Sequence, residues 1–290
     1  MNAARQWENR VLASRAQKIQ PQGKIWSTMA QWYDSWVRHN DYVSKTLPIL
    51  LPFIHSKSRI LEVGPGTGAF TIPLAKHCSS LLAVEPAEGM QKALHRNLDQ
   101  QHISNVHIMP ERIEHALDTL SQQEPFDLTM ASFALYDVEK IVPVLKTLRE
   151  RSARVAILLG TGEQPEWSCS LYRFSSNQHV FSPQLDCLQP LLIELGFIYN
   201  VNLIPCSCNY VFPNEHSMLE WWTKKLRTPR NLLPQLKAAL KTLSTKQNGV
   251  IGIYSQRTAA LVTIEGEYAS LPSLFIEKNR VSRENLFIGR

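Results

Sequence analysis

The stretch that most constrains the fold runs from Arg59 to Ala75 and reads RILEVGPGTGAFTIPLA. Its first residues are apolar and predict a short buried strand, after which the glycines Gly64, Gly66 and Gly68 predict a tight turn. Apolar residues then recur with helical spacing. Such a turn lets the backbone approach a ligand closely, because glycine has no Cβ atom. It also directs the free N–H groups of a helix N-terminus toward whatever binds there.

Strand and helix patterns alternate from this stretch to about residue 160. Further strands are predicted at 81–84, 106–109, 126–130 and 154–159, and helices at 88–98 and 138–150. This alternation predicts an α/β fold, Rossmann-like, with a mostly parallel sheet and helices on both faces. Ligands of such sheets bind beyond the carboxyl ends of the strands. We therefore expect one crevice around the residues that follow the strands: Gly64–Gly68, Glu85, Arg112–Glu114 and Ala131–Asp137.

The later part of the chain predicts a sheet edge that is antiparallel rather than parallel. Residues 200–212 and 250–264 alternate like strands, and two helical stretches lie between them. We interpret these as an antiparallel pair that completes a seven-stranded sheet, with the last strand antiparallel and a helical insertion at about 214–246. The expected division is an N-terminal helical segment or lid at 1–55, a main domain at 56–266, and a C-terminal tail at 267–290.

Composition excludes several classes of protein. The 290 residues are 44% hydrophobic and 19% charged, which is ordinary for a globular protein. The apolar runs are too short to cross a bilayer, and the N-terminus lacks the apolar stretch of a signal peptide. Five cysteines, thinly spread, favour a reduced, cytoplasmic location. The net charge of +6 permits nucleic-acid binding, but the basic residues are too scattered to favour it.

Two carboxylates decide which ligand the glycine turn suits. The sequence GPGTGA also matches the dinucleotide-binding pattern, so the glycines alone are weak evidence. Glu62 lies two residues before the turn, where it would repel a pyrophosphate but help to receive an ammonium group. Glu85 ends the next strand and can accept both ribose hydroxyls of either cofactor. The antiparallel pair beyond the fifth strand is a feature that the dinucleotide fold does not need.

ILEVGPGTG followed by LLAVEPAEGM closely resembles motif I and the second-strand acidic motif of class I S-adenosylmethionine-dependent methyltransferases, over about residues 58–160. The resemblance implies S-adenosylmethionine as cofactor, S-adenosylhomocysteine as product, and no metal. It also implies roles. The turn would pass its backbone close to the methionine portion and the ribose, Glu62 would steady the turn and the amino group, the second motif would take the ribose hydroxyls, and Met90 would pack on the adenine. The residues so implied are Glu62, Gly64, Pro65, Gly66, Gly68, Glu85, Pro86 and Met90.

The chain departs from this family after the third strand. Where the family often has an acidic residue that binds the adenine amine, this chain has Arg112, which cannot accept a hydrogen bond. The acceptor is then Glu111, Glu114 or a backbone carbonyl, while the Ile113 amide remains available for the adenine ring. The resemblance also places Ala131–Ser132–Phe133 after the fourth strand, beside the reacting centre.

Aromatic residues crowd the segment from 25 to 54. One interpretation is a helix that packs its aromatic side chains on the core. The other is a lid with Tyr33, Trp36, His39 and Asp41 facing the pocket. A second aromatic set is read in the same two ways, as a pocket wall or as core: Trp167, Phe174, Phe181, Trp221 and Trp222.

The function favoured by the sequence is in-line methyl transfer to a small molecule. A general base is needed only if the acceptor must lose a proton, and we name Tyr136, Asp137 and His39 as candidates. The segment ASFALYD lacks the Asn/Asp-Pro-Pro-Tyr/Phe signature of nucleic-acid amino methylation. Cys206 and Cys208 fit no standard zinc spacing. The alternatives are an RNA or protein methyltransferase, a non-catalytic S-adenosylmethionine-binding protein and, last, a nicotinamide enzyme; the oligomeric state stays open.

Overall fold

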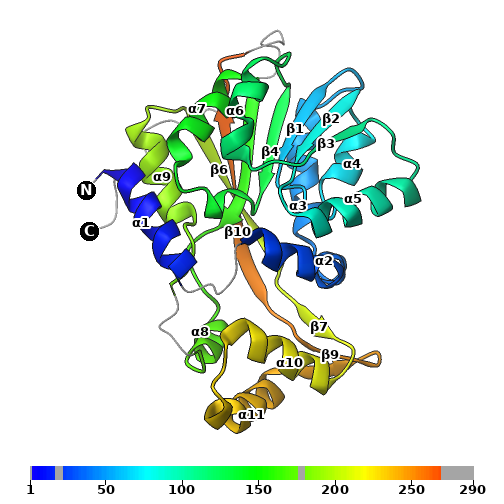
Figure 1. The fold of residues 1–290 in the computed structure, drawn as a ribbon, viewed down its shortest axis with the longest axis vertical. Coiled ribbons are helices and arrows are strands. Elements are labelled where there is room, and N and C mark those ends of the chain that lie inside the picture. Colours follow the sequence, from blue (N-terminus) through cyan, green and yellow to red (C-terminus); the bar gives the residue numbers. More distant parts are fainter. Residues whose placement is uncertain (1, 17–21, 176–179, 269–290) are drawn as a thin grey trace.

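The computed structural model describes residues 2–16, 22–175 and 180–268 (Figure 1). Within them, seven strands form one sheet in the order β3-β2-β1-β4-β5-β10-β6. The strands are β1 Arg59–Val63, β2 Ser80–Val84, β3 Val106–Met109, β4 Leu128–Ser132, β5 Arg154–Gly160, β6 Tyr199–Ser207 and β10 Gln256–Glu265. β1 to β5 are parallel, and β10 runs antiparallel to both neighbours. The predicted Rossmann-like fold is therefore confirmed, including its antiparallel last strand.

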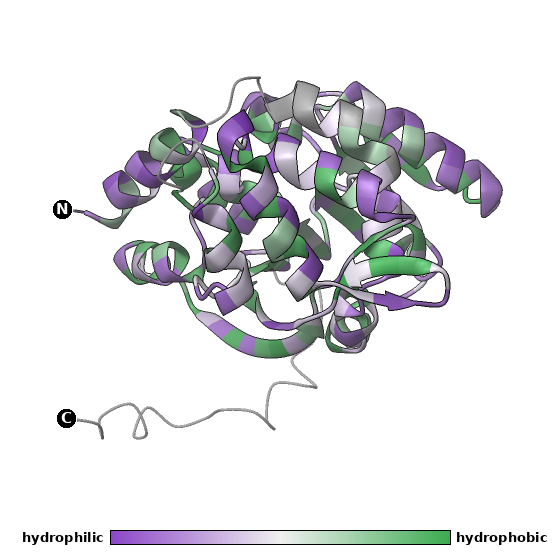
Figure 2. Ribbon diagram, turned by 90° about the horizontal axis from the view of Figure 1, so that it is seen from below, coloured by the Kyte–Doolittle hydropathy of each residue, from purple (hydrophilic) through white to green (hydrophobic). Residues whose placement is uncertain are grey.

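Helices cover both faces of this sheet (Figure 1). One face packs on α1 Ala3–Ala16, α6 Ile113–Ser121, α7 Ile141–Glu150 and α9 Leu185–Glu194. The other packs on α2 Gln22–Arg38, α3 Tyr42–Leu50, α4 Thr71–Ala75 and α5 Glu88–Gln100. Each central strand contributes side chains to the cores on both faces, because successive side chains point to opposite faces. Polar residues accordingly gather on the outward sides of the helices (Figure 2).

A smaller body lies below the main sheet in Figure 1. Its three-stranded sheet has the order β7-β9-β8 and consists of β7 Tyr210–Phe212, β8 Thr245–Gln247 and β9 Val250–Ile253. Three helices pack there, namely α8 Glu166–Tyr172, α10 Glu215–Leu226 and α11 Leu233–Leu243. Trp222, which is 1% exposed, lies in its core. The helices α10 and α11 fall in the stretch expected as an insertion, while the division into domains stays a prediction.

Each of the two long strands expected near the C-terminus is broken into two, so this part of the prediction is wrong. The first splits into β6 and β7, and the second into β9 and β10, so that each half joins a different sheet. Asn209 lies at the break. Its side-chain oxygen accepts the backbone amide of Ser255 at 3.1 Å, and its backbone amide donates to the side-chain oxygen of Asn40 at 2.7 Å. At the crossing these side-chain bonds accompany the backbone bond from the Cys208 amide to the Ser255 carbonyl at 2.8 Å.

The fourth strand lies two residues later than expected, at Leu128–Ser132. Phe126 forms only an isolated bridge with Ser152. Ala131 and Ser132 are therefore inside the strand, and Phe133 is the first residue beyond it. The connection after β5 contains α8, and residues 269–290 of the expected tail lie outside the described residues.

All five cysteines are free thiols. In the described part of the chain, no helix is both long and apolar enough to cross a membrane. The same residues contain no cluster of three or more His, Cys, Asp or Glu side chains arranged to hold a metal ion.

Candidate functional site

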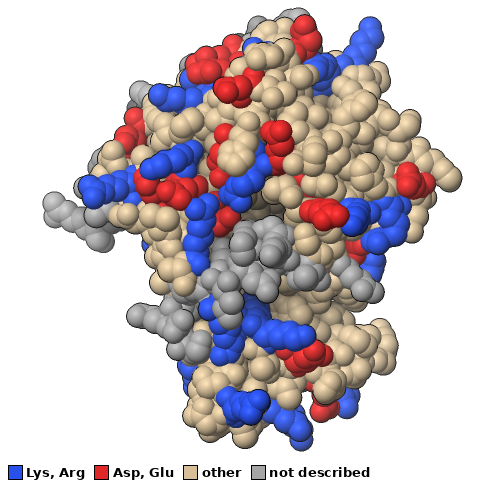
Figure 3. All heavy atoms as spheres, in the orientation of Figure 1, with Lys and Arg blue, Asp and Glu red and all other residues tan. Residues whose placement is uncertain are grey.

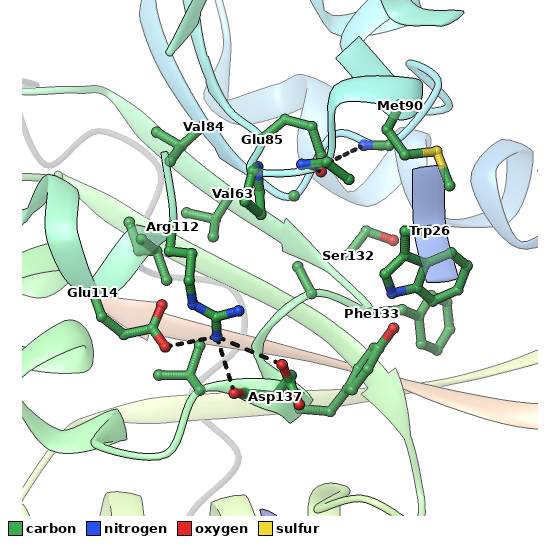
Figure 4. Close-up of a pocket in the computed structure, with 18 of the residues that line it drawn as sticks. Trp26, Val63, Val84, Glu85, Met90, Arg112, Glu114, Ser132, Phe133 and Asp137 are labelled. Atoms are coloured by element: carbon green, nitrogen blue, oxygen red, sulfur yellow. Dashed lines mark hydrogen bonds and ion pairs between the residues drawn. The ribbon is translucent and has the colours of Figure 1, made fainter. Parts of the chain in front are cut away.

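A cavity opens at the carboxyl ends of β1, β2, β3 and β4 (Figure 4). The structure brings most of the predicted site residues to its wall: Tyr33, Gly64, Gly66, Glu85, Pro86, Met90, Arg112, Ile113, Glu114, Ser132, Phe133, Tyr136 and Asp137. Five predicted residues do not line it: Glu62, Pro65, Gly68, Ala131 and His39. The rule that ligands bind at the strand ends therefore located the cavity, although those residues lie far apart in the sequence.

The glycine turn needs its glycines for two measurable reasons. Gly64 and Gly66 have φ angles of +66° and +59°, a region that other residues rarely adopt. A Cβ atom on Gly64 would lie 2.5 Å from the Cβ of Ala134, and one on Gly66 would lie 3.3 Å from the ring of Tyr33. The backbone is thus threaded between α2 and the segment after β4, which leaves no room for a side chain.

Glu85 ties the turn to the end of β2. Its Oε2 accepts the Gly66 amide at 3.1 Å, and its Oε1 accepts the Ala87 amide at 2.8 Å. The carboxyl is buried, which raises its pKa, while the two amide donors partly oppose that shift. Glu85 therefore fixes the shape of the turn and presents an acceptor to the cavity (Figure 4).

Glu62 lies beneath the turn, outside the cavity wall, and is 1% exposed. Burial raises the pKa of its carboxyl to about 8; the hydroxyl of Thr71 partly opposes this shift and the charge of Glu85 adds to it. Its Oε2 has no hydrogen-bond partner in the described chain. The carboxyl therefore favours its protonated form more than an exposed glutamate does.

Arg112, which departs from the family pattern, is held by carboxylates (Figure 4). Its guanidinium pairs with Glu114 at 2.9 Å and with Asp137 at 3.5 Å, and although burial lowers its pKa, these pairs raise it overall. Asp137 also pairs with Arg15 of α1 at 3.1 Å. Glu114 and Asp137 are therefore engaged by arginines, and the network fastens α1 to the wall of the cavity.

We predict that Asp137→Asn lowers the free energy of unfolding by about 2 kcal/mol, because two arginines lose a largely buried partner. The matched control is Asp186→Asn. It removes an exposed ion pair between Asp186 of α9 and Arg10 of α1, and it should cost less than about 0.5 kcal/mol of stability. Urea unfolding measures the loss of stability in both variants. Hydrogen exchange in α1 should increase only in Asp137→Asn. Equal, small losses would contradict the role of the network.

The aromatic N-terminal segment is partly core and partly cavity wall. Trp26 and Tyr33 of α2 line the cavity, whereas Trp36 is buried in the core. His39 is exposed at the end of α2 and its Nδ1 bonds to the Ser35 carbonyl at 2.7 Å. Asp41 accepts the Ser207 amide at 2.7 Å, away from the cavity wall. Of the four residues expected to face the pocket, only Tyr33 reaches it.

The second aromatic set forms core and no part of this cavity wall. Trp222 and Phe174 are buried in the smaller body, with Trp167 and Trp221 packed against them. Phe181 contacts Tyr172, with ring centroids 5.2 Å apart. The pocket-wall interpretation of this set is therefore wrong for the cavity described here.

Sequence reasoning missed several residues of the wall. Val138 lies one residue beyond the segment expected at the cavity and carries no polar group that would single it out. Trp26 lies in the aromatic cluster that the sequence does display, so the composition of that segment was the available signal.

Comparison with known proteins agrees with this geometry. Residues 60–153 match a family model described as a methyltransferase domain. The chain is 40% identical over 72 residues to the ribosomal RNA small subunit methyltransferase A of Desulforapulum autotrophicum, covering 24% of this chain and 25% of that protein. It is 29% identical over 86 residues to a protein of Methanocaldococcus jannaschii named "Probable cobalt-precorrin-6B C(15)-methyltransferase (decarboxylating)", covering 30% of this chain and 44% of that protein. The chain thus spans less than half the length of each of these curated relatives.

Solved structures show the same fold. The YcgJ protein of Bacillus subtilis aligns with a TM-score of 0.50 and 18% identity, covering 77% of this chain and 99% of that one. A cyclopropane-fatty-acyl-phospholipid synthase-like protein of Lactobacillus casei aligns with a TM-score of 0.50 and 15% identity, covering 77% and 90%. Residues 60–153 thus match a methyltransferase domain, and the sheet that contains them has the fold of these solved structures.

Proposed function

We propose that this protein transfers the methyl group of S-adenosylmethionine to a small-molecule acceptor. The observation that carries the proposal is the glycine turn locked by Glu85 at the carboxyl ends of β1 and β2, inside the matched methyltransferase domain. Gly64 and Gly66 let the backbone of the turn pass close to Ala134 and Tyr33 at the border of the cavity, and we call this border the cradle. A cofactor held there would lie along β1 to β3, with its reacting end toward Phe133.

The polar groups around the cradle fit that cofactor. Glu62 Oε2 and Ser132 Oγ are buried without hydrogen-bond partners in the described chain. Glu85 suits the ribose hydroxyls, and Met90 with Trp26 offers apolar surface for the adenine. Glu62 lies beneath the turn, where its charge would act on an ammonium group through the turn rather than from the cavity wall. Arg112 cannot accept from the adenine amine, so the backbone carbonyls of that segment remain as acceptors.

S-adenosylmethionine supplies an already activated methyl group, so the contribution of the chain is chiefly orientation. The cradle and Glu85 would fix the donor, and Tyr33 and Phe133 would shape the space where the acceptor approaches. Asp137 is engaged by two arginines, so Tyr136 remains the better candidate base of the pair at the cavity wall. His39 lies outside that wall, which weighs against a role for it.

The distribution of charge on the surface favours a small molecule over RNA as the acceptor. On the face shown in Figure 3, Lys and Arg side chains alternate with Asp and Glu, whereas binding to a phosphate backbone favours a continuous basic surface. The similarity to a ribosomal RNA methyltransferase keeps RNA as the second candidate. The precorrin methyltransferase is a relative that acts on a small molecule, as its name states.

Calorimetry tests the donor: S-adenosylmethionine should bind in the micromolar range. Glu85→Ala should weaken binding by about tenfold or more, because charge-assisted hydrogen bonds to the carboxylate are lost. Methyl-labelled donor is then incubated with the protein and either a small-metabolite fraction or purified ribosomal RNA. Label in the metabolite fraction supports the proposal, label in RNA supports the second candidate, and the absence of donor binding overturns both.

A further inference from the structure

Arg112 uses only one of its nitrogens in the contacts that hold it at the cavity wall. Its Nη2 donates to the Glu114 carboxylate at 2.9 Å and to the Asp137 carbonyl at 3.3 Å, and the same atom lies 3.5 Å from the Asp137 carboxylate. Its Nε and Nη1 make no hydrogen bond with the described residues. Figure 4 shows a guanidinium nitrogen outside these contacts directed toward the middle of the cavity. Arg112 therefore keeps N–H donors that a ligand can use.

The proposed cofactor would place its nucleobase at this part of the wall. The strand β3 lies at the sheet edge, next to β2 and away from β1 and β4. Glu85 at the end of β2 suits the ribose, and the reacting end of the cofactor would lie toward Phe133 after β4. The base is attached to the opposite side of the ribose, so it would extend toward β3. Arg112 and Ile113, which follow β3, line the cavity there.

This part of the wall is rich in donors and poor in acceptors. Ile113 is the first residue of α6, a position at which the backbone N–H has no partner within the helix. The carbonyls of Met109 and Arg112 each accept two backbone amides already, at 2.9–3.0 Å and 3.0–3.2 Å. The carbonyls of Pro110 and Glu111 remain, but neither residue lines the cavity. An N–H group of a ligand would therefore meet mostly other donors.

The local charge favours a neutral group as the partner of Arg112. Two arginines, Arg15 and Arg112, already face three carboxylates in one network, namely Glu114, Asp137 and Glu139. An anionic ligand would add repulsion from these carboxylates. A carbonyl oxygen accepts hydrogen bonds without that repulsion, and a guanidinium is a strong, charge-assisted donor to it.

We infer that Arg112 determines the base specificity of the donor site, and that the site accepts a purine with a carbonyl oxygen in place of the adenine amine. The oxygen would accept from the guanidinium and from the Ile113 amide, whereas the amine of adenine would face donors. This inference rests on the proposed function, because it concerns the base of the proposed cofactor. It extends that function to donors and inhibitors that carry a 6-oxopurine.

S-inosylhomocysteine and S-adenosylhomocysteine are matched probes, since one carries the 6-oxo group and the other the 6-amino group on the same nucleoside scaffold. By calorimetry, we expect the unmodified protein to bind S-inosylhomocysteine at least as tightly as S-adenosylhomocysteine, within about threefold. Arg112→Met should shift the ratio of the two dissociation constants by about tenfold in favour of S-adenosylhomocysteine, because the oxygen loses its charged donor. Arg112→Lys, which keeps a charged donor, should shift the ratio less.

Arg15→Met is the matched control. It also removes an arginine from Asp137, at 3.1 Å, but Arg15 does not line the cavity, so the ratio should stay unchanged. Circular dichroism verifies that each variant is folded, and the ratio in the unmodified protein decides the matter even if Arg112→Met is not.

Two results would overturn the inference. One is a preference of the unmodified protein for S-adenosylhomocysteine by more than about threefold, because Glu114 or a carbonyl would then accept the amine. The other is an unchanged ratio in folded Arg112→Met, because the guanidinium would then not contact the base. Binding of neither probe to the unmodified protein would instead overturn the proposed function itself.

Discussion

Gly66→Arg is expected to weaken S-adenosylmethionine binding by at least about hundredfold, which corresponds to about 3 kcal/mol. A Cβ atom there would meet the Tyr33 ring at 3.3 Å, and the longer side chain must enter the cavity that the turn borders. The positive φ angle of 59° adds strain. Calorimetric titration of the cofactor measures the loss directly.

The chain offers a matched control for the strain alone. Gly196 ends α9 with a φ angle of +67°, and a Cβ atom there would meet nothing within 4 Å. Gly196→Arg should therefore cost about 1–2 kcal/mol of stability, as left-handed strain does, and leave cofactor binding unchanged. If both variants bound the cofactor equally, the turn would not form the cofactor site.

Glu62→Gln is expected to remove a strong dependence of stability on pH. The folded carboxyl has a pKa of about 8, above its usual 4.5, so between these values the folded state holds a proton that the unfolded state has lost. The stability of the unmodified protein therefore falls as pH rises toward 8. Relative to the unmodified protein, the variant should gain about 4 kcal/mol between pH 5 and pH 8.5.

The same substitution should weaken cofactor binding, because an amide cannot neutralise the ammonium group. Binding at pH 7 should release a proton from Glu62, which calorimetry in buffers of different ionisation enthalpy detects, and this release should vanish in the variant. Glu88→Gln is the control, since that exposed carboxyl has a lowered pKa through its pair with Lys92. Parallel stability curves for Glu62→Gln and the unmodified protein would refute the assignment.

Local patterns in the sequence predicted the parts of the site that depend on short stretches. The glycine turn, Glu85 and Met90 lie on consecutive elements, so their spacing alone indicated a common cavity. The strand-end rule then added the segments after β3 and β4. The error of two residues in β4 arose because Phe126 and Asp127 continue the strand pattern while the ladder begins at Leu128.

Contacts between distant segments escaped the sequence for a physical reason. Whether Asp137 is a free base or an ion-pair partner depends on Arg15, which is 122 residues away. The break between β6 and β7 depends on Asn209 meeting Ser255 and Asn40. Side-chain partners of this kind leave no periodicity in the sequence, because they are set by how separate elements pack.

The sequence by itself determined the architecture around the glycine turn: a parallel sheet, the turn after its first strand, and carboxylates at Glu62 and Glu85. Hydrophobic periodicity and glycine conformation act within a few residues, so they can be read along the chain. Only the tertiary structure decided that Arg112 and Asp137 are paired. Burial and electrostatic pairing are properties of the folded neighbourhood, and they exist only once the strands have assembled.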